Sequence, residues 1–254
     1  MPLIHTEAIT LRRRRTRDAD ALVILFGKTS GKVTASTKSV MKTKSRFAGV
    51  SQPFNRLHAV LYAKREDQDI WTLTQASLLE TYDKLQQDLN RLAYASCLAE
   101  WVDFLSNEFQ SSQRVWDTLV QAFARWNQEE PNQEELFFYQ WKLLVAAGLQ
   151  PDITRCMHTG IETAPRWVFQ PKDGGIATAD NHEGYTIQGG TIQALRKIAI
   201  SSKPPTLTLN TQQKKEITTL LKLHMEFHAG LKSRAGMFLD TWMNQQGRPK
   251  QGEV

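Results

Sequence analysis

Cysteine and long apolar runs are both scarce in this sequence. Its 254 residues include two cysteines, Cys97 and Cys156, which cannot form the disulfide framework of a small secreted domain, so we expect a reducing compartment. No apolar run approaches the roughly 18 residues of a membrane-spanning helix. The length is enough for one large domain or two small ones with a substantial core.

Acidic residues are missing between Asp20 and Glu66, a stretch that holds nine basic residues. Residues 1–65 contain 14 Lys and Arg against 3 Asp and Glu, whereas the other 189 residues contain 18 against 23. The basic residues could simply form a solvated surface that binds no ligand. Such a surface, however, would not require the positive charge to be confined to one part of the chain. The segregation predicts a polyanionic partner for the N-terminal part.

Residues 11–26, LRRRRTRDADALVILF, place positive charge beside an apolar stretch as a signal peptide does. Asp18 and Asp20 interrupt this pattern, Lys28 ends the apolar stretch, and no small-residue cleavage site follows. A nuclear-targeting signal is also the weaker interpretation of the arginines. We expect a cytoplasmic protein without a membrane partner.

Catalytic motifs are absent as well. The sequence has no P-loop, no G-x-S-x-G and no dinucleotide-binding glycine pattern. Cys97 lies in the apolar stretch AYASCLAEW and is better explained as a core residue than as a nucleophile. We expect a protein that is not an enzyme.

What is present begins with five β-rich segments bounded by turn signals, the number found in an OB-type barrel. They are EAITLRRRR (7–15), ALVILFGK (21–28), KVTASTKSV (32–40), HAVLYAKRE (58–66) and DIWTLTQA (69–76). Residues 41–56 form a long basic loop that contains Phe47 and Phe54, and OB barrels use aromatic residues as platforms on which bases stack.

The pattern becomes helical near Ser77, where Ser77 and Glu80 have the spacing of a capping box. Apolar residues then recur at helical spacing in residues 78–92, 115–126 and 136–145, and we expect these helices to form a bundle core. Two more helical stretches, 191–200 and 211–242, flank Pro204 and Pro205. The predicted fold is α+β: an OB barrel in residues 1–76, then a helical domain in residues 77–254 with an irregular glycine-rich insertion at about 156–185.

Two groups of residues could in principle bind a metal. Cys156 and His158 could act with His182, Asp180 or Asp173, but the paired C-x-x-C spacing of a strong zinc site is missing. His224 and His228 lie four residues apart without a third ligand. We expect neither group to hold a metal, and we expect no cofactor.

The order of these features resembles the RecO family of bacterial recombination mediators. The similarity lies in AITLRRRRTRDADALVILFGKTSGKV, KSRFAGVSQPFNRLHAVLYAKRE, LNRLAYASCLAEW, WKLLVAAGLQPDITRCMHTG and GLKSRAGMFLD, and it covers nearly the whole chain. Many family members carry C-x-x-C twice and bind zinc there. Here Thr159, Thr178 and Asn181 stand in place of three of those cysteines, so the resemblance implies a degenerate loop without zinc.

The resemblance implies a mediator that binds single- and double-stranded DNA, anneals complementary strands and, with RecR, helps load RecA onto DNA coated with single-strand-binding protein (SSB). It also implies contact with the acidic C-terminal tail of SSB, which we assign to Lys232 and Arg234 beside an apolar stripe. The DNA-binding residues that we expect are Arg12, Arg13, Arg14, Arg15, Lys38, Lys42, Lys44 and Arg46. An RNA-binding OB protein, for example a ribosome-associated factor, is the alternative, because charge does not distinguish RNA from DNA.

Overall fold

The computed structural model describes residues 2–16, 20–38, 47–65, 68–180 and 182–246. Contacts divide the chain into two compact units. Residues 1–130 and 234–254 form the barrel unit, and residues 131–233 form the inserted unit. The chain therefore leaves the barrel unit after residue 130 and returns to it at residue 234.

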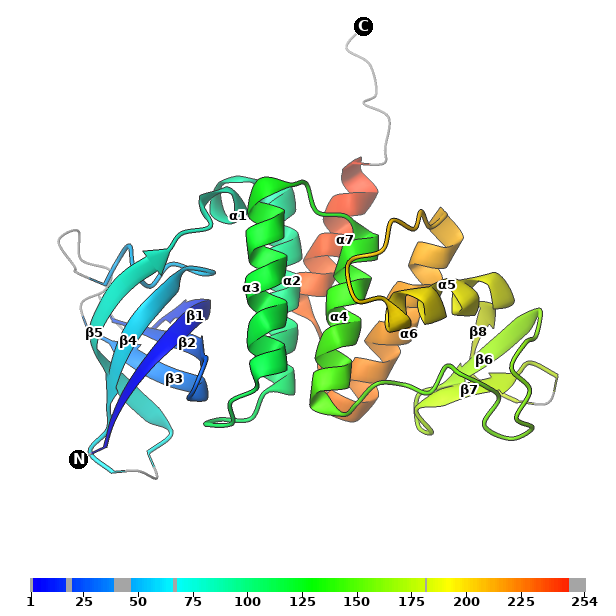
Figure 1. Cartoon of the computed structure of the whole chain (residues 1–254), viewed down its shortest axis with the longest axis horizontal. Coiled ribbons are helices and arrows are strands. Elements are labelled where there is room, and N and C mark those ends of the chain that lie inside the picture. The colour runs from blue at the N-terminus through cyan, green and yellow to red at the C-terminus, as the bar shows by residue number, and fades with distance from the viewer. Residues whose placement is uncertain (1, 17–19, 39–46, 66–67, 181, 247–254) are drawn as a thin grey trace, which may run out of the picture. The chain divides into compact units, whose positions relative to one another are not determined.

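Five strands of the barrel unit close into a barrel in the order β1-β2-β3-β5-β4 (Figure 1). Alternate residues of β2, namely Ala21, Val23 and Leu25, belong to the barrel core, as the two-residue period of a strand requires. The predicted OB-type barrel is confirmed. The strands are β1 (Leu3–Arg15), β2 (Ala21–Gly27), β3 (Gly31–Thr37), β4 (Arg56–Tyr62) and β5 (Ile70–Glu80).

Helices of the barrel unit follow the last strand. The predicted capping box at Ser77 and Glu80 is wrong, because β5 continues to Glu80 and Ser77 pairs with His58 of β4. The first long helix begins instead behind Asp88, whose side chain accepts a hydrogen bond from the Arg91 N–H. The helices are α1 (Asp83–Gln87), α2 (Leu89–Leu105), α3 (Gln113–Gln128) and α7 (Arg234–Gln246).

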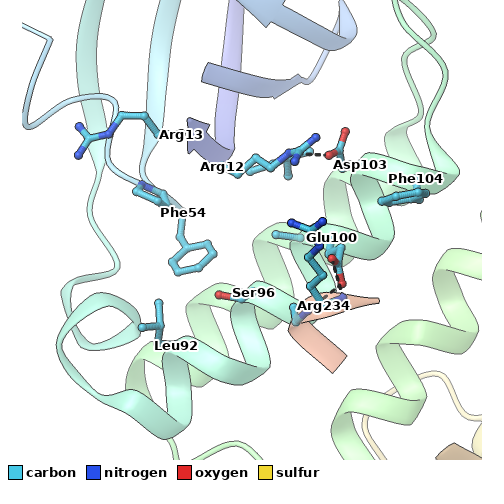
Figure 2. A pocket seen from close by; sticks show the side chains of 13 residues that line it. Arg12, Arg13, Phe54, Leu92, Ser96, Glu100, Asp103, Phe104 and Arg234 are labelled. Atoms are coloured by element: carbon cyan, nitrogen blue, oxygen red, sulfur yellow. Dashed lines mark hydrogen bonds and ion pairs between the residues drawn. The ribbon is translucent and has the colours of Figure 1, made fainter. Parts of the chain in front are cut away.

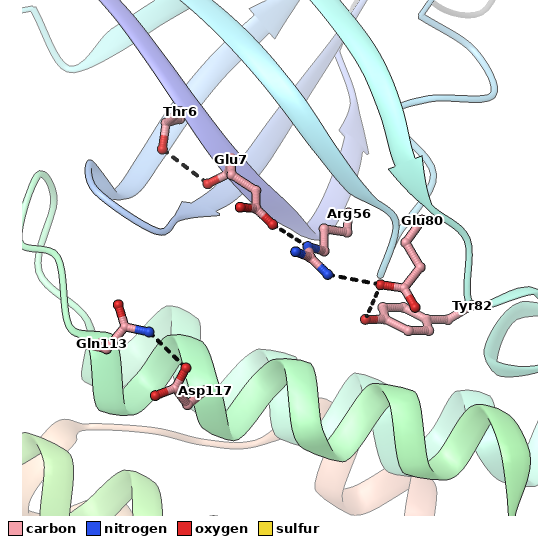
Figure 3. A network of polar contacts seen from close by, with 7 residues as sticks. All are labelled: Thr6, Glu7, Arg56, Glu80, Tyr82, Gln113 and Asp117. Carbon is pink, nitrogen blue, oxygen red and sulfur yellow. Dashed lines mark hydrogen bonds and ion pairs between the residues drawn. The ribbon is translucent and has the colours of Figure 1, made fainter.

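A polar network joins three parts of the barrel unit at Arg56, the first residue of β4 (Figure 3). Its guanidinium contacts Glu7 of β1 and lies 3.0 Å from Glu80 Oε2, while the Tyr82 hydroxyl donates to the same Glu80 oxygen over 3.2 Å. Burial, and then the nearby Glu80 carboxylate, raise the pKa of Tyr82 well above its ordinary value. The phenol therefore stays protonated and can keep donating to Glu80.

The inserted unit combines helices with a second sheet, of order β7-β6-β8. Residues 156–185, predicted to be irregular, in fact contribute to this antiparallel sheet. Gly148 ends α4 in the left-handed conformation, with φ of 68°, which glycine adopts without the strain that a Cβ would bring. The elements are α4 (Gln133–Ala147), β6 (Arg166–Gln170), β7 (Gly175–Thr178), β8 (Tyr185–Gln188), α5 (Gly189–Ile200) and α6 (Thr211–Ala229).

The stretch 211–242, predicted as one helical segment, is divided into two helices. Gly230 ends α6 with φ of 66°, and α7 begins at Arg234. Leu231 and Leu239 are buried, but Phe227 and Phe238 are 56% and 45% exposed. No helix among the described residues is long and apolar enough to cross a membrane.

We expect Gly31→Ala to destabilise the barrel unit more than Gly49→Ala. Gly31 has φ of 69°, and a Cβ there would lie 2.2 Å from the Gln110 carbonyl oxygen, so alanine would strain the backbone and displace residues 107–110. A loss of more than about 1 kcal/mol of unfolding free energy should appear in chemical denaturation. At Gly49 nothing lies within 4 Å, and a change within about 0.5 kcal/mol is expected. Equal effects of the two substitutions would contradict the tight packing at Gly31.

Candidate nucleic-acid interface

The four consecutive arginines lie at the end of β1, but they do not share one face. A bulge shifts the pairing with β2 between Thr10 and Arg12, so the alternation of side chains restarts after Leu11. Two arginines then stand opposite core-facing residues of β2, and two stand opposite residues of its other face. The pairs are Arg12–Ile24, Arg13–Val23, Arg14–Leu22 and Arg15–Ala21.

Arg13 stabilises the loop that precedes β4. Its guanidinium donates to the Ala48 carbonyl over 3.0 Å and to Gln52 Oε1 over 3.3 Å. The same loop buries Phe47 and Phe54, which are 6% and 1% exposed. Arg13 is therefore occupied within the fold, and the two phenylalanines are not available for stacking on bases.

Arg12 faces α2 on the other side of the strand. Its Nε lies 2.8 Å from Asp103 Oδ2, and Lys32 Nζ lies 3.6 Å from the other oxygen of the same carboxylate. Lys32 also lies 3.9 Å from Glu108, whose pKa is raised by burial. The Asp103 side chain is 8% exposed and that of Arg12 is 59% exposed, so the carboxylate is covered while Arg12 still meets solvent.

Arg14, Arg15 and Lys38 are exposed at one end of the barrel. Lys38 directly follows β3, whose last residue Thr37 pairs with Ala21, and Ala21 pairs with Arg15. Within the described part of the chain, Arg14 and Lys38 make no ion pair. The predicted residues Lys42, Lys44 and Arg46 lie outside the described residues. We call Arg14, Arg15 and Lys38 the basic end of the barrel.

Two exposed aromatic residues were not singled out from the sequence. Phe104, near the end of α2, is 47% exposed, and Phe109, in the segment that follows, is 41% exposed. Phe109 has φ of 58°, its N–H donates to the Lys32 carbonyl over 2.9 Å, and its ring centroid lies 5.5 Å from that of Trp71. Phe104 has no sequence signal, because helical spacing alone does not show which face of α2 remains uncovered, and Phe109 lies beyond the end of that helix.

A cavity of about 310 Å³ lies within the barrel unit, between the end of β1 and α2 (Figure 2). We call it the β1–α2 cavity. Apolar side chains and three arginines line it, together with the carboxylates of Glu100 and Asp103. The lining residues are Leu11, Arg12, Arg13, Pro53, Phe54, Leu92, Ser96, Ala99, Glu100, Asp103, Phe104, Arg234 and Ala235.

Of the two residues assigned to an acidic tail, only Arg234 lines this cavity. Arg234 is the first residue of α7, and its backbone N–H and that of Ala235 donate to the Glu100 carboxylate over 3.1 and 3.2 Å. Glu100 thereby satisfies the free N–H groups at the start of α7. Lys232 is exposed but belongs to the inserted unit, so the pairing of Lys232 with Arg234 stays a prediction.

The histidine and cysteine residues of the inserted unit fall into separate small groups. The rings of His158 and His182 stack with centroids 4.2 Å apart. His224 and His228 lie 4.4 Å apart, and their Nε2 atoms bond the carbonyls of Leu149 and Pro171. Burial lowers the pKa of His224. Within the described ranges, no group of three potential ligands could hold a metal ion.

Both cysteines are buried, but their surroundings shift the thiol pKa in opposite directions. Burial raises the pKa of Cys97, which keeps it a thiol in the core as predicted. At Cys156 burial also acts to raise the pKa, but hydrogen bonds from the Thr159 side chain and from the backbone of Thr178, His158 and Thr159 lower it to about 6. Hydrogen-bond donors surround this sulfur as they would surround a charged thiolate.

A closed barrel with an exposed basic end is typical of nucleic-acid-binding proteins. Residues 1–82 match the family described as Recombination protein O N terminal, and residues 86–235 match Recombination protein O C terminal. The DNA repair protein RecO of Symbiobacterium thermophilum is 26% identical over 251 residues, which cover 95% of this chain and 98% of that protein. Its counterpart from Alkaliphilus metalliredigens is 31% identical over 181 residues, which cover 71% of this chain and 72% of that protein.

The chain belongs to the RecO family of DNA repair proteins, and the resemblance found in the sequence is confirmed. This family is not one of enzymes, in agreement with the missing catalytic motifs.

We expect Cys156 to be a thiolate in the folded protein at neutral pH. The ultraviolet absorbance of thiolate should show a transition near pH 6 that is lost in Cys156→Ser and kept in Cys97→Ser. The pKa of Cys156 in the folded protein lies below its ordinary value, so the thiolate stabilises the folded state. This contribution to the free energy of unfolding is complete above the ordinary thiol pKa and disappears as the pH falls through about 6. A transition near the ordinary pKa of about 8.5 would show that the surrounding donors do not act on the sulfur.

Proposed function

We propose that this protein is a recombination mediator that binds single- and double-stranded DNA and anneals complementary strands. We further propose that it acts with RecR to help load RecA onto DNA coated with SSB. Membership of a DNA repair family supports the class of function. The observation that carries the DNA-binding part is the basic end of the barrel, where Arg14 and Lys38 are exposed and make no ion pair within the described residues.

The mechanism is charge neutralisation without bond making or breaking. Two DNA strands repel each other, and lysine and arginine side chains that contact their phosphates release counterions and lower this repulsion. A surface that holds both strands also raises their local concentration. Arg14 and Lys38 suit this role because neither side chain has an acidic partner in the described structure, whereas Arg12 and Lys32 share the carboxylate of Asp103.

The proposed protein partners are RecR and the acidic C-terminal tail of SSB. The acidic tail of SSB needs a basic surface, and Arg234 supplies an exposed positive charge at the start of α7. Lys232 remains the second residue assigned to this tail. A repair protein of bacteria acts where the chromosome lies, so we place it in the cytoplasm at the nucleoid.

We expect Arg14→Ala/Lys38→Ala to slow annealing of complementary oligonucleotides coated with SSB, followed by FRET at two salt concentrations. The variant should bind single strands several-fold more weakly. The slope of log affinity against log salt should fall by about 0.7 for each phosphate contact removed. The matched control is Arg114→Ala, which removes an exposed arginine from α3.

Two outcomes would contradict this proposal. Wild-type protein that binds the oligonucleotides but never anneals them would remove the mediator function. Tighter binding to RNA than to DNA of the same sequence would favour an RNA-binding protein instead.

We also expect Arg13→Ala and Arg14→Ala to separate stability from DNA binding. Arg13→Ala removes two hydrogen bonds to the loop before β4 and should lower the unfolding free energy by about 1–2 kcal/mol. Arg14→Ala should change it by less than about 0.5 kcal/mol, yet weaken DNA binding more. Denaturation curves and anisotropy titrations of both variants test this. An Arg13→Ala protein of unchanged stability that binds DNA poorly would place Arg13 at the phosphates instead.

A further inference from the structure

The β1–α2 cavity is built from one end of the barrel and one face of α2, and its wall has two chemical characters. Leu92, Phe54 and Phe104 supply apolar surface, whereas Arg12 and Arg234 supply positive charge (Figure 2). At about 310 Å³ it lies near the lower limit of small-ligand pockets, so it suits a ligand of one residue or one nucleotide.

The two arginines are placed to meet an anion. Arg12 is held at its Nε by Asp103, which fixes its direction, while 59% of its side chain remains exposed. Arg234 is exposed and is anchored through its backbone N–H to Glu100. Among the described residues, no acceptor bonds the Arg234 guanidinium, so its donors remain available.

Phe104 gives the cavity a flat apolar side. It is 47% exposed, so its ring is accessible to a ligand in the cavity that it lines. A nucleobase that stacks on such a ring removes apolar surface from water whatever its sequence.

We propose that the β1–α2 cavity holds one unpaired nucleotide of single-stranded DNA, with its phosphate at Arg12 and Arg234 and its base against Phe104. This inference rests on the proposed DNA-binding function and adds a base-contacting site to it. Arg12 precedes Arg14 by two residues on β1, so a strand bound at the basic end of the barrel can continue into the cavity.

An acidic peptide is the competing ligand, and the wall of the cavity favours the nucleotide. Glu100 and Asp103 repel the carboxylates of an acidic peptide and the phosphates of DNA alike, but ionised acidic side chains offer these oxygens no hydrogen-bond donor. The same oxygens can accept hydrogen bonds from the amino groups of unpaired bases. A base within a duplex cannot enter without being unpaired and unstacked, so the cavity distinguishes single strands from duplexes.

The test compares an ordinary single-stranded oligonucleotide with an abasic one of equal length, by fluorescence anisotropy on the full chain. Wild type should prefer the ordinary strand by about 5- to 10-fold. Phe104→Ala should abolish this preference without changing affinity for a duplex. Phe238→Ala is the matched control, because Phe238 is 45% exposed in the same unit but does not line the cavity. Thermal denaturation should show that both variants are folded.

Each outcome has one meaning. Equal binding of both strands by wild type, or a preference that Phe104→Ala keeps, would overturn the nucleotide site while leaving phosphate binding intact. A wild type that binds neither strand would remove the proposed function itself. If an acidic peptide displaces DNA from wild type but not from Phe104→Ala, and no preference over the abasic strand exists, the cavity is a peptide site and the nucleotide proposal fails.

Discussion

The buried carboxylate of Asp103 determines how the basic strands of the barrel are used. A carboxylate that is 8% exposed has to be paired, and the barrel supplies Arg12 from β1 and Lys32 from β3. The pairing joins α2 to the barrel and gives Arg12 a fixed direction. The pairing also neutralises part of the positive charge that would otherwise be available to bind a ligand. The surface available to phosphate is consequently narrower than the composition of residues 1–65 suggests.

The elements that sequence patterns predicted well are those whose burial follows one simple period. β3 alternates buried and less buried residues, and α3 buries one stripe, including Val115, Leu119 and Phe123. The errors arose where tertiary pairing overrides local preference. Ser77 can cap a helix, but β4 lies beside it and continues the sheet to Glu80. The small sheet β6–β8 was missed because its strands are four or five residues long, too short for a clear alternation.

For the candidate site, the segregation of positive charge pointed to β1, but it did not show which group each arginine side chain contacts. A one-residue bulge before Arg12 determines which arginines face the loop before β4 and which face α2. The identities of Thr10, Leu11 and Arg12 do not predict this bulge. The β1–α2 cavity was equally inaccessible, because Arg234 is more than 200 positions from Arg12 in the chain and only the return of α7 brings them together. Cys156 shows the reverse case: the residue was noticed, but the donors around it became visible only in three dimensions.

The position of α7 in the chain has a consequence for biosynthesis. The barrel and α2 are made first, yet Glu100 and Tyr94 meet their α7 partners, Arg234 and Met243, only after the whole inserted unit has been translated. Until then one side of α2 is uncovered on the ribosome. A nascent chain that stops before residue 234 would thus carry a closed barrel with an incomplete helical wall, and the β1–α2 cavity would be among the last features to form.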